Sequence, residues 1–274
     1  MSTKILFINT DIVPYIPEGR MAVIGRQLAQ GMQEKGHEIR TFMPRFGRVS
    51  ERRCQLHEVI RLSGMNLIID DTDHPLIIKV ASIQPARMQV YFIDNDDYFT
   101  SRKMSYADGE GNEYEDNGER MVFFARGVIE TIRKLRWTPD VVYCQGWFTS
   151  VAPIYIKRAF NEDACFKRTK VVFAAYDNMF QTPIAANFTR LVQRDGITKS
   201  DLKEWADKKL SCVEVTRMAL KYSDGLVITD PNIDPALLAQ AEKYGLKVLD
   251  CSKDTELNLD KYHEFFEQFA QPEQ

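Results

Sequence analysis

The chain has 274 residues, 44% hydrophobic and 27% charged, which suffices for one full α/β core plus a small extra element. Its 36 basic and 39 acidic residues are interspersed and give a net charge of −3, which excludes a polyelectrolyte surface for nucleic acid or anionic lipid. No run approaches the about 18 apolar residues of a membrane span, and no signal peptide precedes Lys4, so we expect a cytoplasmic protein without membrane contact.

The amino-terminal part predicts a strand, a loop, a helix and a second strand. Residues 4–9 form a short apolar run, typical of a central strand buried on both faces of a parallel sheet. After the loop 10–18, apolar residues recur three or four apart, and a glycine follows where a helix would end. These residues are Met21, Ile24, Leu28, Met32 and Gly36. The next strand is expected at 38–43.

The middle of the chain interrupts this alternation. Residues 67–69, 76–83 and 88–93 are strand-like runs between polar turns, which predicts a β-hairpin insertion within 55–95. The acidic, glycine-rich stretch 107–118 has no periodicity and predicts an exposed loop. A long helix follows, and its apolar face comprises Met121, Phe124, Val128, Ile132 and Leu135.

The remaining sequence alternates regularly between strands and helices. Strands are expected at 141–144, 170–175, 226–229 and 246–249, and helices near 150–160, 201–222 and 237–244. An amphipathic terminal helix follows, which Asn258 can cap. The alternation implies a doubly wound, mostly parallel, Rossmann-like α/β sheet. We therefore predict a single domain, 1–274, closed by the strand and helix within 246–270.

Common catalytic and cofactor motifs are missing from the sequence. The first loop has neither G-x-G-x-x-G nor a Walker lysine, which argues against dinucleotide or ATP binding through those motifs. The histidines His37, His57, His74 and His263 lack metal-ligand spacing, so we expect no metal and no histidine base. The five cysteines are scattered without a C-x-x-C pair and are interpreted as reduced and mostly packing, Cys144 within a buried strand. No cofactor is predicted.

A ligand site is expected outside the carboxyl ends of the strands, where loops and helix amino termini converge in an open α/β sheet. The segments 10–20, 143–148, 175–181 and 229–234 reach that rim. The candidate ligand-binding residues are Asp11, Gly19, Arg20, Tyr143, Gln145, Trp147, Asn178 and Gln181. Arg20 could meet an anion or be an exposed helix arginine. Tyr143 and Gln145 could bind a hydroxyl group or pair with each other.

Three further groups of side chains have a functional and a structural interpretation. Tyr98, Phe99, Tyr106 and Tyr114 could stack on sugar rings or pin the long loop to the core. The acidic residues of 108–119 are interpreted as a solvated loop, because their spacing lacks the order of a calcium-binding loop. The arginines of 45–53 are interpreted as a solvated face that could still hold one anion.

Six sequence blocks keep the order and spacing of a known enzyme family. They are Lys4-Ile-Leu-Phe with Pro14-Tyr15, Gly36-His-Glu-Ile, Met43-Pro-Arg-Phe-Gly, Tyr91-Phe-Ile-Asp-Asn, Asp116-Asn-Gly-Glu-Arg and Arg136-Trp-Thr-Pro-Asp-Val-Val-Tyr-Cys-Gln-Gly-Trp-Phe. Together they resemble the amino-terminal, acceptor-side domain of bacterial glycogen synthases and starch synthases, from Lys4 to about Asp230. The resemblance implies a GT-B-type amino-terminal domain, with a glucan or a sugar nucleotide as ligand.

The sequence departs from this family where the donor sugar binds. The family's K-T-G-G-L loop, whose lysine binds donor phosphate, reads Pro17-Glu-Gly-Arg-Met here. The histidines and aspartate of the family's H-A-H-D strand end correspond to Tyr143, Gln145 and Gly146. The resemblance further implies that a carboxyl-terminal domain, outside these 274 residues, holds most of the donor nucleotide. Glucosyl transfer needs positioned cations in a closed cleft, and half a cleft supplies few.

Three functions follow as hypotheses. The first is a synthase-like domain without catalysis of its own, which binds a glucan, a sugar nucleotide or a protein partner at the open cleft face. The second is an active glucosyltransferase, from ADP- or UDP-glucose to an α-1,4-glucan, completed by a separate nucleotide-binding subunit. An exposed apolar patch beside Tyr143 and Trp147 would favour it. The third is a structural or scaffolding protein on the same fold.

Overall fold

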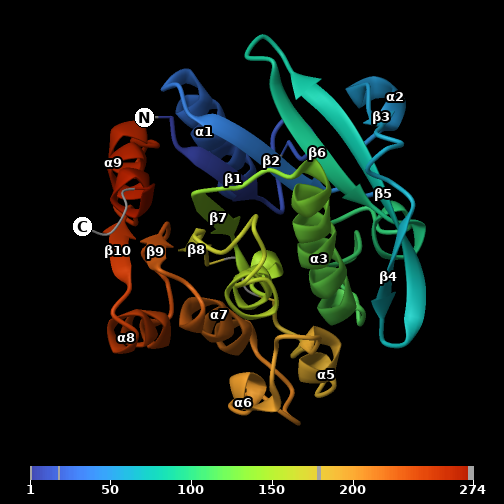
Figure 1. Cartoon of the computed structure of the whole chain (residues 1–274), viewed down its shortest axis with the longest axis vertical. Helices are drawn as coiled ribbons and strands as arrows, with labels where there is room; N and C mark the ends of the chain where they lie inside the picture. The colour runs from blue at the N-terminus through green and yellow to red at the C-terminus, as the bar shows by residue number, and fades with distance from the viewer. Residues whose placement is uncertain (1, 18, 178–179, 271–274) are drawn as a thin grey trace.

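The protein is organised around one ten-stranded, mostly parallel sheet (Figure 1). The computed structural model describes residues 2–17, 19–177 and 180–270. The strands are β1 Lys4–Ile8, β2 Glu38–Pro44, β3 His57–Glu58, β4 Met65–Ile69, β5 Thr72–Ile83, β6 Met88–Asp94, β7 Val141–Gln145, β8 Lys170–Ala175, β9 Gly225–Ile228 and β10 Lys247–Asp250. Their order is β10-β9-β8-β7-β1-β2-β6-β5-β3, and β4 pairs with β5. The predicted Rossmann-like α/β class is confirmed.

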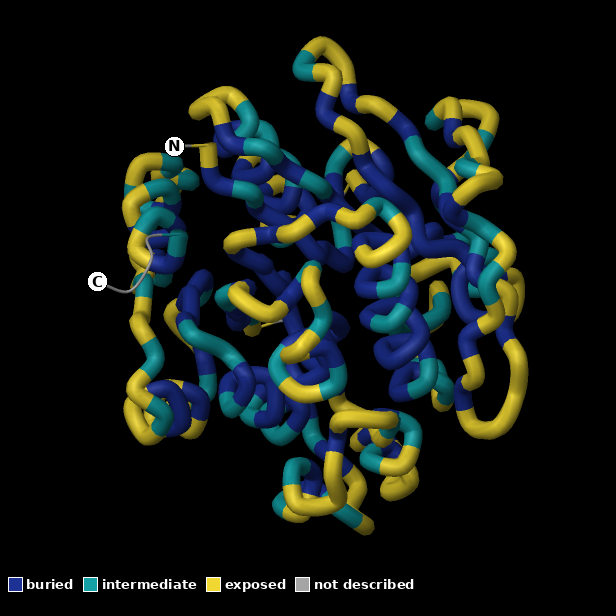
Figure 2. The backbone as a smooth tube through the Cα atoms, in the orientation of Figure 1, coloured by how far each residue is buried: buried dark blue, intermediate teal, exposed yellow. Residues whose placement is uncertain are grey.

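Helices cover both faces of the sheet. They are α1 Arg20–Glu34, α2 Glu51–Cys54, η1 Asp96–Thr100, α3 Asn117–Leu135, η2 Trp147–Thr149, α4 Ala152–Ile154, η3 Tyr155–Ala159, α5 Phe188–Val192, α6 Lys199–Leu202, α7 Cys212–Lys221, α8 Pro235–Lys243 and α9 Leu259–Ala270. Helices α1 and α9 contact each other over one face, while α3, α4, α7 and α8 form a continuous layer over the other. The buried strands lie between these layers, and exposed residues gather in the loops (Figure 2).

The strand order reverses between β1 and β7. From β1 the chain moves through α1 to β2 on one side, and from β7 it moves to β8, β9 and β10 on the other. Right-handed crossovers in opposite directions place the connecting helices on opposite faces. In open α/β sheets this reversal opens a crevice at the carboxyl ends of the two strands. The segments after Ile8 and after Gln145 meet there.

Two predicted helices are wrong in detail. The helix expected near 150–160 is divided into α4 and η3. The helix expected at 201–222 is two helices, α6 and α7, because Ser211 begins a new one. The Ser211 hydroxyl accepts from the Glu214 amide at 3.3 Å, and the Glu214 carboxylate accepts from the Ser211 amide at 3.0 Å. Such a capping box fixes a helix start.

The segment 55–95 extends the main sheet. Strand β6 pairs in parallel with β2, from Thr41 with Val90 to Pro44 with Ile93, and β5 returns antiparallel to β6. The runs expected at 67–69, 76–83 and 88–93 are therefore strands, and the last of them continues the parallel part of the sheet.

The terminal helix α9 is an integral part of the core. Asn258 caps it, because its Oδ1 accepts from the amides of Asp260 and Lys261, each at 3.2 Å. Phe266 is fully buried, and its ring packs against those of Phe7 and Tyr143 at 6.2 and 5.8 Å between centroids. No described helix is both long and apolar enough to cross a membrane.

Arg45 is not part of a solvated face, contrary to the sequence interpretation. It is 8% exposed and donates to Glu51 Oε1 at 2.6 Å. Lys79 Nζ bridges Glu51 Oε1 at 2.7 Å and the buried Asp94 Oδ2 at 2.6 Å. Two cations and two carboxylates thus form one network at the ends of β2 and β6. Its charges balance, which is the condition for burying them together.

The cysteines have no disulfide partners, and three of them are buried. Burial raises the pKa of Cys144 far above its usual range, that of Cys212 to about 12 and that of Cys251 to about 11. Because the thiolate is the reactive form, we expect iodoacetamide at pH 7.5 to leave these three thiols unmodified in the folded protein. Peptide mass spectrometry should find all five alkylated in denaturant. Rapid modification of native Cys144 would contradict the packing seen here.

Candidate functional site

The candidate site lies at the reversal point, where α1 approaches the carboxyl ends of β1 and β7 closely. Asn9 follows β1 and Gln145 ends β7, and both side chains are fully buried beneath α1. A Cβ atom at Gly25 would stand 2.6 Å from the Asp11 carbonyl oxygen and 3.1 Å from Gln145 Oε1. Only glycine therefore lets α1 pack here, and this packing closes the space directly above the strand ends.

Gln145 is bound by the protein's own groups. Its Nε2 donates to the Tyr176 hydroxyl at 2.9 Å and to the Met21 carbonyl oxygen at 3.0 Å. Burial raises the pKa of Tyr176 far above its usual range, so this phenol stays neutral. The three residues join β7, the segment after β8 and the first turn of α1. At the position where the resemblance places a catalytic histidine, the chain has a buried amide without acid–base capacity.

Tyr143 and Trp147 also contact protein groups. The Tyr143 ring is fully buried between Phe7 and α9, and burial raises its pKa far above the usual range. Trp147 is 4% exposed, with Phe180 and Tyr106 edge-on at 4.6 and 5.7 Å between centroids. Neither ring presents a face to solvent on which a sugar could stack.

Arg20 ties the first helix to the opposite side of the rim. Its guanidinium donates to the Thr229 carbonyl oxygen at 2.7 Å, to Asp230 Oδ1 at 3.0 Å and to the Asp254 carbonyl oxygen at 3.2 Å. The side chain is 44% exposed. Gly19 precedes it with φ 94°, a left-handed conformation that favours glycine. The one cation that the sequence offers near the donor loop is therefore engaged with three oxygen atoms.

The other predicted residues are more peripheral. Asp11 is half-buried beside Gly25, and Gln181 is exposed on the loop after β8. Glu113 fastens this loop, because its two carboxylate oxygens accept from the amides of Gln181 and Thr182 at 2.7 and 2.6 Å. Sequence reasoning placed Glu113 in a solvated acidic loop and missed this contact, which has no local sequence signal. Asn178 lies outside the described residues.

The aromatic residues near the long loop pin it to the core. Tyr98 and Phe99 are 3% and 0% exposed, and the Tyr98 hydroxyl donates to Glu119 at 2.8 Å. Tyr106 packs on Trp147, and Tyr114 lies under the guanidinium of the buried Arg120 at 5.0 Å from its ring centroid. Of the two interpretations left open by the sequence, the structural one describes these contacts.

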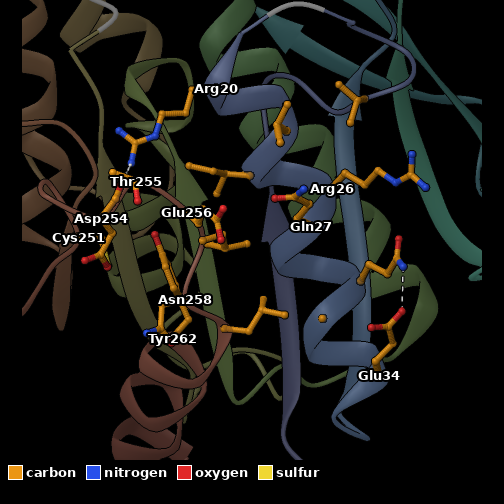
Figure 3. A pocket seen from close by; sticks show the side chains of 17 residues that line it. Arg20, Arg26, Gln27, Glu34, Cys251, Asp254, Thr255, Glu256, Asn258 and Tyr262 are labelled. Atoms are coloured by element: carbon orange, nitrogen blue, oxygen red, sulfur yellow. Dashed lines mark hydrogen bonds between the residues drawn. The ribbon is translucent and has the colours of Figure 1, made fainter.

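A groove of about 770 Å³ lies beside the strand ends, between α1 and the segment that leads into α9 (Figure 3). Arg20 stands at one end of it, and Glu34 lies further along α1. Gln27, Glu256 and Asn258 supply polar groups to its walls, and Ile24, Leu257 and Leu259 supply apolar ones. Of the predicted site residues that the structure describes, Arg20 alone lines this groove. Its mixed lining suits a hydroxylated ligand better than a polyanion.

One group of described side chains has the composition of a metal site. His37, His263 and Glu267 offer ligand atoms that all lie within 4.8 Å of one another. The group lies on the contact between the amino-terminal segment and α9, away from the rim. Sequence spacing gave no sign of it, because His37 and His263 are 226 residues apart.

The sheet order, with its reversal between β1 and β7, defines a Rossmann-like α/β domain whose fold matches that of a GT-B glycosyltransferase catalytic domain. The sequence profile of the starch synthase catalytic domain family matches residues 4–249. The chain belongs to this family.

Several known proteins are similar to it. A glycogen synthase of Chlorobium luteolum is 29% identical over 174 residues, which are 64% of this chain and 36% of that protein. One of Chlorobaculum parvum is 24% identical over 263 residues, 92% of this chain and 51% of that protein. The catalytic domain of starch synthase IV from Arabidopsis thaliana, solved with ADP and acarbose, superposes with a TM-score of 0.71 at 15% identity, covering 91% of this chain and 51% of that one. The chain thus spans about half the length of its relatives, or less.

Proposed function

We propose that this polypeptide is a glycogen/starch synthase-like domain that binds a ligand without transferring glucose by itself. The observation that carries the proposal is the hydrogen bonding of Gln145, whose buried amide nitrogen donates to Tyr176 and Met21. Glucosyl transfer develops negative charge on the leaving phosphate, which has to be met by positioned donors and cations. Among the described residues, the strand ends present to such a group neither an imidazole nor a guanidinium that is free of protein contacts.

A glucan is the ligand that the surface supports best. Arg20 is held by Asp230 and two carbonyl oxygens, so a nucleotide diphosphate would have to displace all three contacts. A glucan carries hydroxyl groups and no charge, and the amides and carboxylates beside the strand ends can bind hydroxyl groups. A sugar nucleotide and a protein partner are the other ligands that a titration would reveal.

The second hypothesis, an enzyme completed by another subunit, finds less support. It would be favoured by an exposed apolar patch beside Tyr143 and Trp147, and these two residues are 0% and 4% exposed. A pull-down that recovers a second glycosyltransferase-like chain would nevertheless revive it.

We expect the purified protein to incorporate no radiolabelled glucose into glycogen from ADP- or UDP-glucose. The reference is the same protein after heat denaturation, with an active glycogen synthase as positive control. The double variant Pro17→Lys, Gln145→His should remain inactive, because these residues alone do not form a closed donor cleft. Elongation of the polymer by the wild-type protein would refute the proposal.

Calorimetric titration with maltooligosaccharides and both sugar nucleotides then identifies the ligand. If none of them releases or absorbs heat, a protein partner remains as the ligand.

A further inference from the structure

Three metal-ligating side chains from opposite ends of the chain meet beside the amino-terminal edge of β1. His37 lies in the turn between α1 and β2, while His263 and Glu267 are four residues apart on α9. This spacing places both α9 side chains on one face of the helix. His37 Nε2 is 2.9 Å from His263 Nδ1, and the carboxylate of Glu267 completes the group within 4.8 Å. No other three His, Cys, Asp or Glu side chains gather in this way among the described residues.

A further residue supports the group from outside. The Thr3 hydroxyl donates to Glu267 Oε1 at 2.7 Å, and the Thr3 amide donates to His37 Nδ1 at 3.2 Å. Thr3 and His37 are 4% and 7% exposed, so the group is partly shielded from solvent. The hydroxyl contact to Glu267 is of the kind that orients a metal ligand, whereas the amide contact holds His37 in the tautomer of the metal-free protein.

We propose that His37, His263 and Glu267 bind a divalent transition-metal ion of the zinc class. Two imidazole nitrogens and one carboxylate oxygen form a donor set that suits zinc, and a water molecule can take the fourth position. Tetrahedral geometry with zinc–nitrogen distances of 2.0–2.1 Å places the two nitrogens about 3.3 Å apart. The observed 2.9 Å between them requires the rings to separate by only a few tenths of an ångström.

Binding requires one proton to move. In the metal-free protein the Thr3 amide donates to His37 Nδ1, so His37 Nε2 carries the proton and donates to His263 Nδ1. The metal needs the lone pair of His37 Nε2, so the proton shifts to Nδ1 and the Thr3 contact is lost. The buried Thr3 amide then faces an N–H group and has no acceptor, which lowers affinity by about 5- to 150-fold. Metal–ligand bonds contribute many orders of magnitude and outweigh this loss.

The surrounding charges permit a cation at this position. Glu267 contributes a carboxylate to the group itself. Lys35 is a nearby cation among the described residues, and it is paired with Asp260 at 2.5 Å. The ion would link α9 to the start of β2, across the apolar contact between α9 and the sheet. This site is independent of the strand ends and therefore of the function proposed above.

The test is titration of the metal-free, full-length protein with zinc chloride at pH 7.5. We expect one zinc ion per chain by calorimetry, and a rise in Tm of about 5 °C at a free zinc concentration a hundredfold above Kd. Magnesium should have no effect, because it prefers oxygen ligands in octahedral geometry. Cobalt should give the visible absorption of a four-coordinate site.

Two variants and two matched controls locate the binding. His263→Gln and Glu267→Gln should each weaken zinc binding at least about tenfold, while circular dichroism without metal shows that they fold. Glu264→Gln changes an exposed residue of the same helix, and His57→Gln an exposed histidine elsewhere, so both should bind zinc as the wild type does. A wild-type protein that binds no zinc, or equal affinities in Glu267→Gln and Glu264→Gln, would overturn the proposal.

Discussion

Replacing Phe266 by alanine should lower the free energy of unfolding by about 3–5 kcal/mol, the range for a large aromatic side chain removed from a packed core. Phe266 is fully buried, and its ring contacts those of Phe7, Tyr143 and Tyr262. Helix α9 packs closely against β9, because a Cβ at Gly225 would stand 2.6 Å from the Phe269 ring. The cavity should therefore persist rather than collapse.

Urea unfolding followed by circular dichroism measures this loss. Glu264→Ala, on the exposed side of the same helix, is the control and should change stability by less than about 0.5 kcal/mol. Similar midpoints and slopes for the two variants would show that α9 is not part of the cooperative core.

Replacing Asp94 by alanine should be about as damaging, at about 3–5 kcal/mol, because it leaves buried cations without their partner. Asp94 is 1% exposed, and its carboxylate accepts from Lys79 Nζ at 2.6 Å and from the Thr100 hydroxyl at 3.0 Å. Without it, Lys79 and Arg45 share the single carboxylate of Glu51. Their ammonium and guanidinium groups would then repel each other in a site shielded from water.

The companion variants separate charge from shape. Asp94→Asn keeps the side-chain volume and an acceptor for Thr100 but removes the charge, so most of the loss should remain. Glu51→Gln should cost less than Asp94→Ala, since the Glu51 side chain is 43% exposed and water can replace its contacts. Equal losses at positions 51 and 94, measured by urea unfolding, would show that burial does not determine the strength of this network.

The sequence predicted the sheet well because most of its strands are signalled locally. Short apolar runs such as 4–8 and 170–175 are buried on both faces of the sheet. Segments with helical periodicity flank them, so their assignment as strands has few alternatives. The helix expected at 201–222 failed because Ser211 and Glu214 form a cap that an apolar pattern does not reveal. Likewise, Arg45 is polar in sequence but neutralised by Asp94 and Glu51, which come from other elements.

The candidate site was harder to predict than the fold. The rim segments follow from strand order, and the structure brings Arg20, Gln145 and their neighbours to the carboxyl ends of the strands. Whether a side chain there faces solvent depends on contacts across the fold, such as Tyr176 with Gln145 or Glu113 with the loop at Gln181. The group of His37, His263 and Glu267 was not predicted for the same reason, because local spacing cannot show that His37 meets His263.

The contact between the first strand and the last helix has a consequence for biosynthesis. Phe7 belongs to a central strand, yet one of its aromatic partners, Phe266, is translated about 260 residues later. Until α9 has been translated and has left the ribosome, that face of the sheet is uncovered and available to chaperones or to other nascent chains. Completion of the core therefore has to wait until α9 emerges from the exit tunnel.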